Sequence, residues 1–369
     1  MEIIEHETKK EMVKQLGIID CDVHQSVNSY EDLKPYLPRS WWNRLGGEGY
    51  GVGSGGVFPG PNYPSPVGIL REDSYPENGA PGSDIEFTKK QLLDEYGIEY
   101  AILTGAALHL SVLANADFAS SMASAYNQWT AEKWLNADSR FKGSIIIAPQ
   151  DPKEAAKEID RWSSHPNFIQ VQMGGAAKMP YGDRYFDPIF EACERNSLPL
   201  AIHPGAEGDG VSHPLTPLGH VQHYIERHCV LPQTIMTHLI TMVFQGVFNK
   251  FPGLKVVVLE YGIAWMPHMM WRMDKNYKGL RMEVPWLEKR PSDYIREHVR
   301  LATQPIEEPD KIGQLDQIIE MMGTDKMVMF SSDYPHWDFD SPKASLNLIK
   351  DKNLKNRILR DNAKEFYGL

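Results

Sequence analysis

Short apolar segments alternate with helical segments along most of this 369-residue chain, and this alternation is the strongest constraint on its fold. The helical segments carry start signals such as Asp151-Pro152, an N-cap followed by proline at the first helical position. Eight buried strands are predicted, at residues 17–24, 100–104, 143–148, 168–173, 198–203, 234–238, 254–260 and 327–333. Eight strands that alternate with helices predict an α/β protein with a single (β/α)8 TIM barrel spanning residues 1–369.

Three segments fall outside the alternation. Residues 1–16 form a charged N-terminal arm without a signal-peptide pattern. Residues 39–81 are dense in glycine and proline with scattered aromatics, and they predict a long insertion after strand one that acts as a lid or rim. Residues 265–326 are too long for one connection and predict a helical elaboration over the mouth of the barrel.

The composition narrows the classes of partner. A formal net charge of -11 argues against nucleic acid or an anionic membrane surface as the main partner. No apolar run approaches the roughly 20 residues that a membrane-spanning helix needs. The 3 cysteines are odd in number and widely spaced, so neither a disulfide framework nor a zinc knuckle is indicated. These features predict a cytoplasmic protein that acts on a small molecule.

Acidic and histidine residues stand at the ends of the predicted strands. They are Asp22 and His24, His203, His238, Glu260 and Asp333. Because the C-terminal ends of all barrel strands meet at one mouth, these side chains are predicted to lie together there. Since residues two apart share a face of a strand, Asp20, Asp22 and His24 are predicted to point the same way. Each residue alone could cap a helix or be satisfied in the core, but together they favour a metal site.

The most specific motifs in the chain are Ile19-Asp-Cys-Asp-Val-His24, Ile202-His-Pro204, the stretch from His238 through Phe251-Pro252 to Gly262, and Ser332-Asp-Tyr-Pro-His336. With these motifs the chain resembles the amidohydrolase-related (amidohydrolase 2) family, in the branch of aminocarboxymuconate semialdehyde decarboxylase, from Ile18 to the C-terminus. Related members decarboxylate hydroxybenzoates such as γ-resorcylate and 5-carboxyvanillate, and others hydrolyse C–C bonds of ring-cleavage products. The resemblance implies a barrel enzyme that forms a homodimer.

The resemblance also implies roles for individual residues. The ligands that it implies for one divalent metal are Asp22, His24, His203 and Asp333. His238 would be the proton-transfer residue, and Glu260 would lie close to it. The chain departs from the family pattern at Asp22, where many members have histidine or glutamate. Mixed nitrogen and oxygen ligation predicts zinc and also fits manganese or iron.

The residues of the predicted site also favour a single metal ion. Two-metal members of the superfamily place a bridging carboxylated lysine on strand four, whereas that strand here offers only Gln170 and Gln172. Asp333 can both touch the metal and accept the proton of a bound water, whose pKa the metal lowers. His238 can then act as acid or base on the substrate. Glu260 either orients His238 or caps the next helix.

Weaker assignments rest on loop position alone. The residues placed beside the substrate in this way are Arg300, Gln304, His336 and Trp337. Arg71 and Arg184 are further candidates for a cation that holds a substrate carboxylate. The histidines crowded between residues 213 and 228 are interpreted as a polar surface helix rather than a second metal site.

The predicted function is a metal-dependent hydrolase in which metal-activated water attacks a small, flat, aromatic or ring-cleavage-derived substrate. Hydrolysis is preferred because decarboxylation needs a cation for the substrate carboxylate, and no arginine has an unmistakable position at the mouth. The alternative is a metal-dependent non-oxidative decarboxylase of an aromatic or muconate-type acid. A catalytically silent metal-binding barrel is the second alternative.

Overall fold

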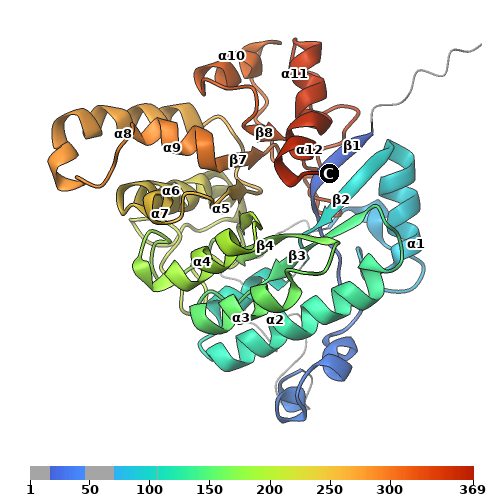
Figure 1. The fold of residues 1–369 in the computed structure, drawn as a ribbon. Coiled ribbons are helices and arrows are strands. Elements are labelled where there is room, and N and C mark those ends of the chain that lie inside the picture. The colour runs from blue at the N-terminus through green and yellow to red at the C-terminus, as the bar shows by residue number, and fades with distance from the viewer. Residues whose placement is uncertain (1–16, 46–69, 106) are drawn as a thin grey trace, which may run out of the picture.

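A parallel sheet of eight strands forms the centre of the protein in a computed structural model, which describes residues 17–45, 70–105 and 107–369. The strands follow one another around the sheet in chain order (Figure 1). Their bounds are β1 Ile18–Val23, β2 Ile98–Leu103, β3 Phe141–Ile146, β4 Phe168–Gly174, β5 Leu200–His203, β6 Val256–Val258, β7 Val299–Ala302 and β8 Val328–Met329. The chain after β8 returns to β1, because the Cys21 amide donates to the Phe330 carbonyl at 3.0 Å and Val23 pairs in parallel with Tyr334. The predicted (β/α)8 barrel is confirmed.

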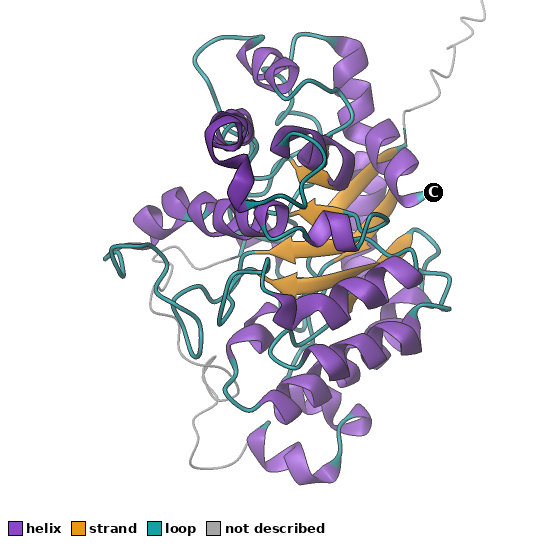
Figure 2. Ribbon diagram, turned by 60° about the vertical axis from the view of Figure 1, so that its left-hand side comes forward, coloured by secondary structure: helices purple, strands orange, loops and turns teal. Residues whose placement is uncertain are grey.

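Helices cover the outside of the strands (Figure 2). Their bounds are α1 Ile85–Thr88, α2 Ala116–Thr130, α3 Pro152–Trp162, α4 Asp187–Arg195, α5 Tyr224–Val230, α6 Pro232–Phe244, α7 Val247–Lys250, α8 Met266–Leu280, α9 Pro291–His298, α10 Gln314–Met321, α11 Lys352–Asn356 and α12 Asn362–Tyr367. Asp151 caps α3 by accepting the Glu154 amide at 3.2 Å, as predicted. Among the described residues, none of the helices combines the length and apolar character that crossing a membrane requires.

The prediction of a strand at residues 234–238 is wrong, because these residues belong to α6. The buried residues of this helix are Ile235, His238, Leu239, Met242 and Val243, at the spacing of one helical face. The predicted seventh strand, residues 254–260, is therefore the sixth strand of the barrel and contains β6. The strand that prediction missed is β7, which lies inside segment 265–326 and is hard to detect because it has 4 residues and Arg300 interrupts its apolar run. This segment thus supplies β7 as a regular part of the barrel.

Apolar side chains from six strands fill the interior of the barrel. They are Ile19, Cys21, Ile102, Ala201, Val257, Leu259, Ala302 and Met329. Ala363 of α12 belongs to the same cluster, and the Tyr367 hydroxyl donates to Oε1 of Gln170 at 2.8 Å. Since Gln170 stands near the start of β4, α12 closes the N-terminal end of the barrel. The C-terminal ends of the strands are left for a site.

The predicted insertion after β1 is described only at its two ends. Residues Arg39–Arg44 form a 3₁₀ helix at the first end. At the other end, Leu70 pairs antiparallel with His336, and the Arg71 amide donates to the Pro335 carbonyl at 3.0 Å. This end of the insertion therefore lies against the loop that follows β8. The rest of the predicted lid, residues 46–69, and the predicted arm at residues 1–16 lie outside the described residues.

Candidate metal centre

A bulge in β1 interrupts the predicted alternation of its side chains. Three residue steps of β1, from Asp20 to Val23, match two steps of β2, from Ala101 to Leu103. Cys21 packs into the interior cluster, whereas Val23 packs into the outer core, so the two do not share a face. Bulges of this kind re-aim side chains beside active sites.

Asp20 does not join the other acidic side chain of β1. Its Oδ1 accepts the amide of Ser332 at 2.9 Å and the amide of Asp22 at 3.3 Å. Burial raises the pKa of Asp20 to about 7. Asp20 therefore joins β1 to the segment that carries Asp333.

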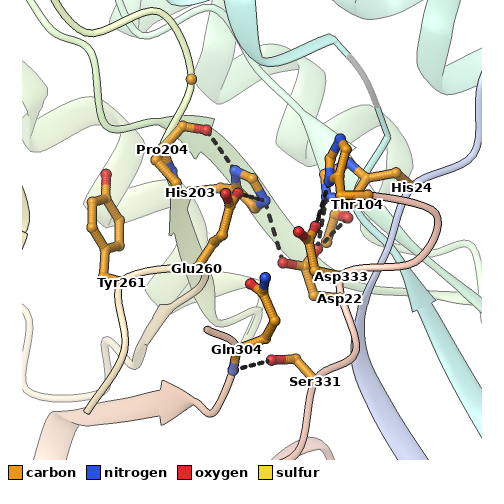
Figure 3. A network of polar contacts seen from close by, with 12 residues as sticks. Asp22, His24, Thr104, His203, Pro204, Glu260, Tyr261, Gln304, Ser331 and Asp333 are labelled. Atoms are coloured by element: carbon orange, nitrogen blue, oxygen red, sulfur yellow. Dashed lines mark hydrogen bonds and ion pairs between the residues drawn. The ribbon is translucent and has the colours of Figure 1, made fainter. Parts of the chain in front are cut away.

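Four buried side chains meet at the C-terminal end of the barrel (Figure 3). They are the predicted ligands Asp22, His24, His203 and Asp333, and one ligand atom of each lies within 4.8 Å of the others. His24 Nε2 lies 3.4 Å from Asp22 Oδ1 and 3.0 Å from Asp333 Oδ1. His203 Nε2 lies 3.2 Å from Asp22 Oδ2. Metal–ligand bonds of about 2.0–2.2 Å place neighbouring ligand atoms at separations of this order.

The hydrogen bonds around this four-residue cluster leave its ligand atoms free. The Nδ1 of His24 donates to the Gly105 carbonyl at 2.8 Å, and the Nδ1 of His203 donates to the Pro204 carbonyl at 2.6 Å. These bonds leave the Nε2 lone pair of each ring for a metal. Neither Nε2 has a hydrogen-bond partner, nor does Oδ2 of Asp22 or of Asp333. Because four buried orphaned atoms are costly and one divalent cation satisfies them all, the cluster is a buried metal-binding site.

Glu260 borders this cluster from the end of β6. Its Oε2 lies 3.2 Å from His203 Nε2, and its Oε1 lies 3.9 Å from His228 Nε2. Burial, together with the charge of Asp333, raises the pKa of Glu260. Glu260 has a φ of 56° and Asp333 a φ of 59°, in the left-handed region that costs a residue with a side chain of order 1–3 kcal/mol. The fold therefore holds both carboxylates at the mouth despite backbone strain.

His336 adds a titratable ring beside the cluster. Its Nδ1 donates to Asp333 Oδ1 at 2.6 Å, and its ring centroid lies 4.4 Å from that of His24. Burial disfavours the protonated form of His336, but the negative charges of Asp333 and Glu260 outweigh burial and raise its pKa to about 9. Asp333 thus contacts both the metal cluster and a ring that can carry a proton.

A model of the amidohydrolase family matches residues 19–369 of the chain. The chain belongs to the amidohydrolase family. It is 26% identical over 289 residues to γ-resorcylate decarboxylase of Polaromonas sp. (strain JS666 / ATCC BAA-500), covering 74% of this chain and 84% of that protein. It is 24% identical to 2-amino-3-carboxymuconate-6-semialdehyde decarboxylase of Dictyostelium discoideum, covering 76% of this chain and 75% of that protein. The resemblance inferred from the motifs is confirmed.

The fold is also that of solved relatives. A structure of 5-carboxyvanillate decarboxylase from Novosphingobium aromaticivorans DSM 12444, complexed with manganese and a nitrobenzoic acid, matches with a TM-score of 0.69. The two chains are 20% identical, and the match covers 96% of each. At this identity the likeness establishes the amidohydrolase barrel, and the site must be argued from the residues of this chain.

The proton-transfer role predicted for His238 in this amidohydrolase does not fit its surroundings. Its Nε2 donates to the Gly175 carbonyl at 2.8 Å, and its Nδ1 accepts the Tyr181 amide at 3.1 Å. The ring stacks on Tyr181 at a centroid distance of 4.2 Å, and burial lowers its pKa to about 4. His238 therefore has no free nitrogen for a substrate. Glu260 instead faces His203 and His228, and no hydrogen bond or ion pair between His238 and Glu260 is found among the described residues.

The residues predicted to lie beside the substrate have different positions in the structure. His336 lies at the metal cluster, and Nε2 of Gln304 donates to Oδ2 of Asp338 at 2.9 Å. Trp337 is 43% exposed with its ring 5.8 Å from that of His228, so it belongs to the rim. The prediction that Arg300 lies beside the substrate is wrong. Its guanidinium donates to the carbonyls of Arg296 and Val299. It also lies 5.4 Å from the ring of Phe366, near the closed end of the barrel.

The two other predicted cations are also accounted for. Arg71 pairs with Asp73 at 2.6 Å and lies 4.2 Å above the Phe339 ring. Arg184 lies in the 3₁₀ turn Arg184–Phe186 that precedes α4. Sequence reasoning missed His228 and Asp338, which approach Glu260 from α5 and from the loop after β8. Asp338 follows Asp333 within the same Tyr-Pro-His-Trp loop, which is the one signal that could have drawn attention to it.

Proposed function

We propose that the protein is a metal-dependent, non-oxidative decarboxylase of a small aromatic or muconate-type carboxylic acid. The observation that carries the proposal is the set of four orphaned ligand atoms at the mouth of the barrel. Decarboxylation is favoured over hydrolysis because the two relatives described above, whose matches cover 74% and 76% of this chain, are decarboxylases of such acids. Asp22, His24, His203 and Asp333 would hold the divalent ion. Manganese is supported by the solved relative that contains it, and zinc remains compatible with the two-histidine, two-carboxylate ligand set.

The bound metal would act as a Lewis acid that holds and polarises the oxygens of the substrate. In this proposal His336 delivers the proton. Because its Nδ1 is committed to Asp333, its Nε2 is the nitrogen available to the substrate. The proton passes from His336 Nε2 to the ring carbon that bears the carboxylate. The bond from that carbon to the carboxylate then breaks, its electron pair returns to the ring, and carbon dioxide leaves.

Hydrolysis, with metal-bound water as nucleophile, is the second candidate function. It is favoured by one observation, that no arginine contact to the four-residue cluster is found among the described residues. A carboxylate substrate would therefore meet mainly imidazole and metal charges, because the Arg227 guanidinium near Glu260 is already paired with Glu207 at 3.1 Å. The same cluster in a catalytically silent barrel would bind metal without turnover.

One experiment separates the three functions. The purified protein is stripped with a chelator, reloaded with Mn²⁺ or Zn²⁺, and offered hydroxybenzoates including γ-resorcylate and 5-carboxyvanillate, with carbon dioxide release as the readout. A parallel panel of esters, lactones and vinylogous ring-cleavage diketones tests hydrolysis. We expect metal-dependent carbon dioxide release that falls more than about 100-fold in His24→Ala. The exposed residue His268 provides the matched control His268→Gln, which should retain full activity. Turnover of the second panel alone would establish a hydrolase, and turnover of neither with tight metal binding would establish a silent barrel.

A further inference from the structure

A second group of metal-ligating side chains lies next to the four-residue cluster. It consists of His228, Glu260 and Asp338, and one ligand atom of each lies within 4.8 Å of the others. His228 Nε2 lies 3.3 Å from Asp338 Oδ2 and 3.9 Å from Glu260 Oε1. We call these three residues the second cluster. Its ligand atoms are spaced much like those of the first.

Glu260 belongs to the surroundings of both clusters. Its Oε2 faces His203 of the first cluster at 3.2 Å, while its Oε1 faces His228 of the second. One carboxylate with its two oxygens turned to two ligand sets has the arrangement of a bridging ligand. Two-metal sites in enzymes hold their ions about 3.5–4 Å apart, a separation that a bridging carboxylate spans. Glu260 stands just after β6 with a left-handed φ of 56°.

The side chains of the second cluster are oriented by their neighbours, as metal ligands usually are. His228 Nε2 is buried and has no hydrogen-bond partner, like Nε2 of His24 and of His203. Gln304 holds the Asp338 carboxylate through its amide nitrogen at 2.9 Å. The ring of Tyr224 stacks on His228 at a centroid distance of 5.9 Å. Neighbours that orient ligands in this manner typically surround metal ions.

The charge balance of the mouth also favours a second cation. Four carboxylates gather there, from Asp22, Asp333, Glu260 and Asp338, and one divalent ion neutralises only two of them. Their side chains are at most 13% exposed, so water screens them poorly. In the part of the chain that the structure describes, no arginine or lysine forms an ion pair with either cluster; the buried Arg227 guanidinium acts on Glu260 through its charge but is paired with Glu207 at 3.1 Å. Because Arg227 is shared with Glu207, we expect further positive charge from protonated imidazoles or from a second metal.

We propose that His228, Glu260 and Asp338 bind a second divalent cation and that Glu260 bridges the two ions. The proposal rests on the metal site of the proposed function but not on the reaction assigned to it. The second ion would provide positive charge for a carboxylate substrate beyond that of Arg227, whose guanidinium is already paired with Glu207. It also replaces the prediction of a mononuclear site with one of two metals, without a bridging lysine.

Metal counting and electron paramagnetic resonance test the proposal without substrate. The stripped protein is saturated with MnCl₂, freed of unbound ion, and measured for manganese per chain by mass spectrometry and for its EPR spectrum. We expect two manganese ions per chain and the spectrum of an exchange-coupled pair. Asp338→Asn and His228→Gln should each reduce the content to one ion and give an uncoupled spectrum. Circular dichroism and thermal melting confirm that the variants are folded.

The matched control is Asp340→Asn. Asp340 is a partly buried acid of the same loop, and its Oδ2 accepts the Ile306 amide at 3.0 Å rather than facing His228. This variant should keep two coupled ions. Saturation of the wild type at one uncoupled ion would overturn the proposal and would identify the second cluster as an ion pair of protonated His228. That outcome would leave carbon dioxide release untouched, so a failure here is distinct from a failure of the proposed function.

Discussion

His203 and His238 are both buried histidines, and the fold uses their rings in opposite ways. His203 has one nitrogen bound to the Pro204 carbonyl and the other without a hydrogen-bond partner. His238 has both nitrogens bound to backbone, at Gly175 and Tyr181. A ring with one orphaned nitrogen beside carboxylates is a ligand, whereas a ring with two backbone partners is a structural element. Burial alone therefore does not identify a functional histidine.

The largest effect is expected for His203→Ala. Removing one of four ligands should lower metal content well below one ion per chain and reduce turnover by more than about 100-fold. The metal-free protein should also lose unfolding free energy, because the buried ring donates from Nδ1 to the Pro204 carbonyl and its Nε2 lies 3.2 Å from a carboxylate oxygen of Asp22 and of Glu260. Metal analysis and chemical denaturation check both parts. Full metal content in this variant would break the contrast between the two histidines.

The opposite result is expected for His238→Ala. This variant should bind metal normally but lose about 3 kcal/mol of unfolding free energy, because two buried backbone groups lose their partners and a packed ring is removed. Urea denaturation of the metal-free protein measures the loss. His238→Gln should recover part of it, because the amide can replace one of the hydrogen bonds. A variant that is fully stable but inactive would restore the catalytic role.

A smaller effect is expected for pH. The pKa of His238 is about 4 in the folded protein, below the ordinary histidine value of 6.5. Below pH 6.5 the unfolded chain therefore binds a proton that the folded chain refuses, and stability falls as pH falls until about pH 4. Between pH 7 and pH 5 the wild type should lose about 2 kcal/mol more than His238→Gln in the metal-free state. Parallel urea titrations at the two pH values test this, and equal losses would contradict it.

The smallest effects are expected on KM, for substitutions at the closed and open ends of the barrel. Arg300→Gln should change KM by less than about twofold, because its guanidinium lies against backbone carbonyls and Phe366 at the closed end. Trp337→Ala at the open rim should raise KM several-fold with a smaller change in kcat. Steady-state kinetics measures both, on a compound from the two substrate panels that the protein turns over. A large KM effect from Arg300→Gln would require that the substrate reach a different part of the molecule.

The barrel and its four-residue cluster were predictable because strand ends in this fold converge at one place. Their positions at predicted strand ends grouped Asp22, His24, His203 and Asp333 with His238 and Glu260, and the family resemblance implied which four are the ligands. His238 was misassigned because five residues of α6 imitate a strand when read without the rest of the helical period. β7 was missed because its apolar run is short. The position of Asp20 depends on a bulge that is set by pairing with β2, which no local pattern reveals.

The second cluster shows a different limit of prediction. His228, Glu260 and Asp338 come from a helix, a strand end and a loop, and their separations in sequence carry no regular spacing. His228 was assigned to a polar surface helix together with the other histidines crowded between residues 213 and 228. Only its contact with Glu260 at the mouth distinguishes it from the exposed His223. Such a site can be recognised only in the three-dimensional structure.

The pairing of Leu70 with His336 has a consequence for how this barrel diversifies. Loops at the mouth of a barrel are usually exchanged one at a time, because each is anchored on its own strand. Here the return of the 39–81 insertion shares backbone hydrogen bonds with the loop that carries the proposed proton donor. A graft of either segment from a relative would leave the other without its partner. The two segments should therefore be inherited, and engineered, as one unit.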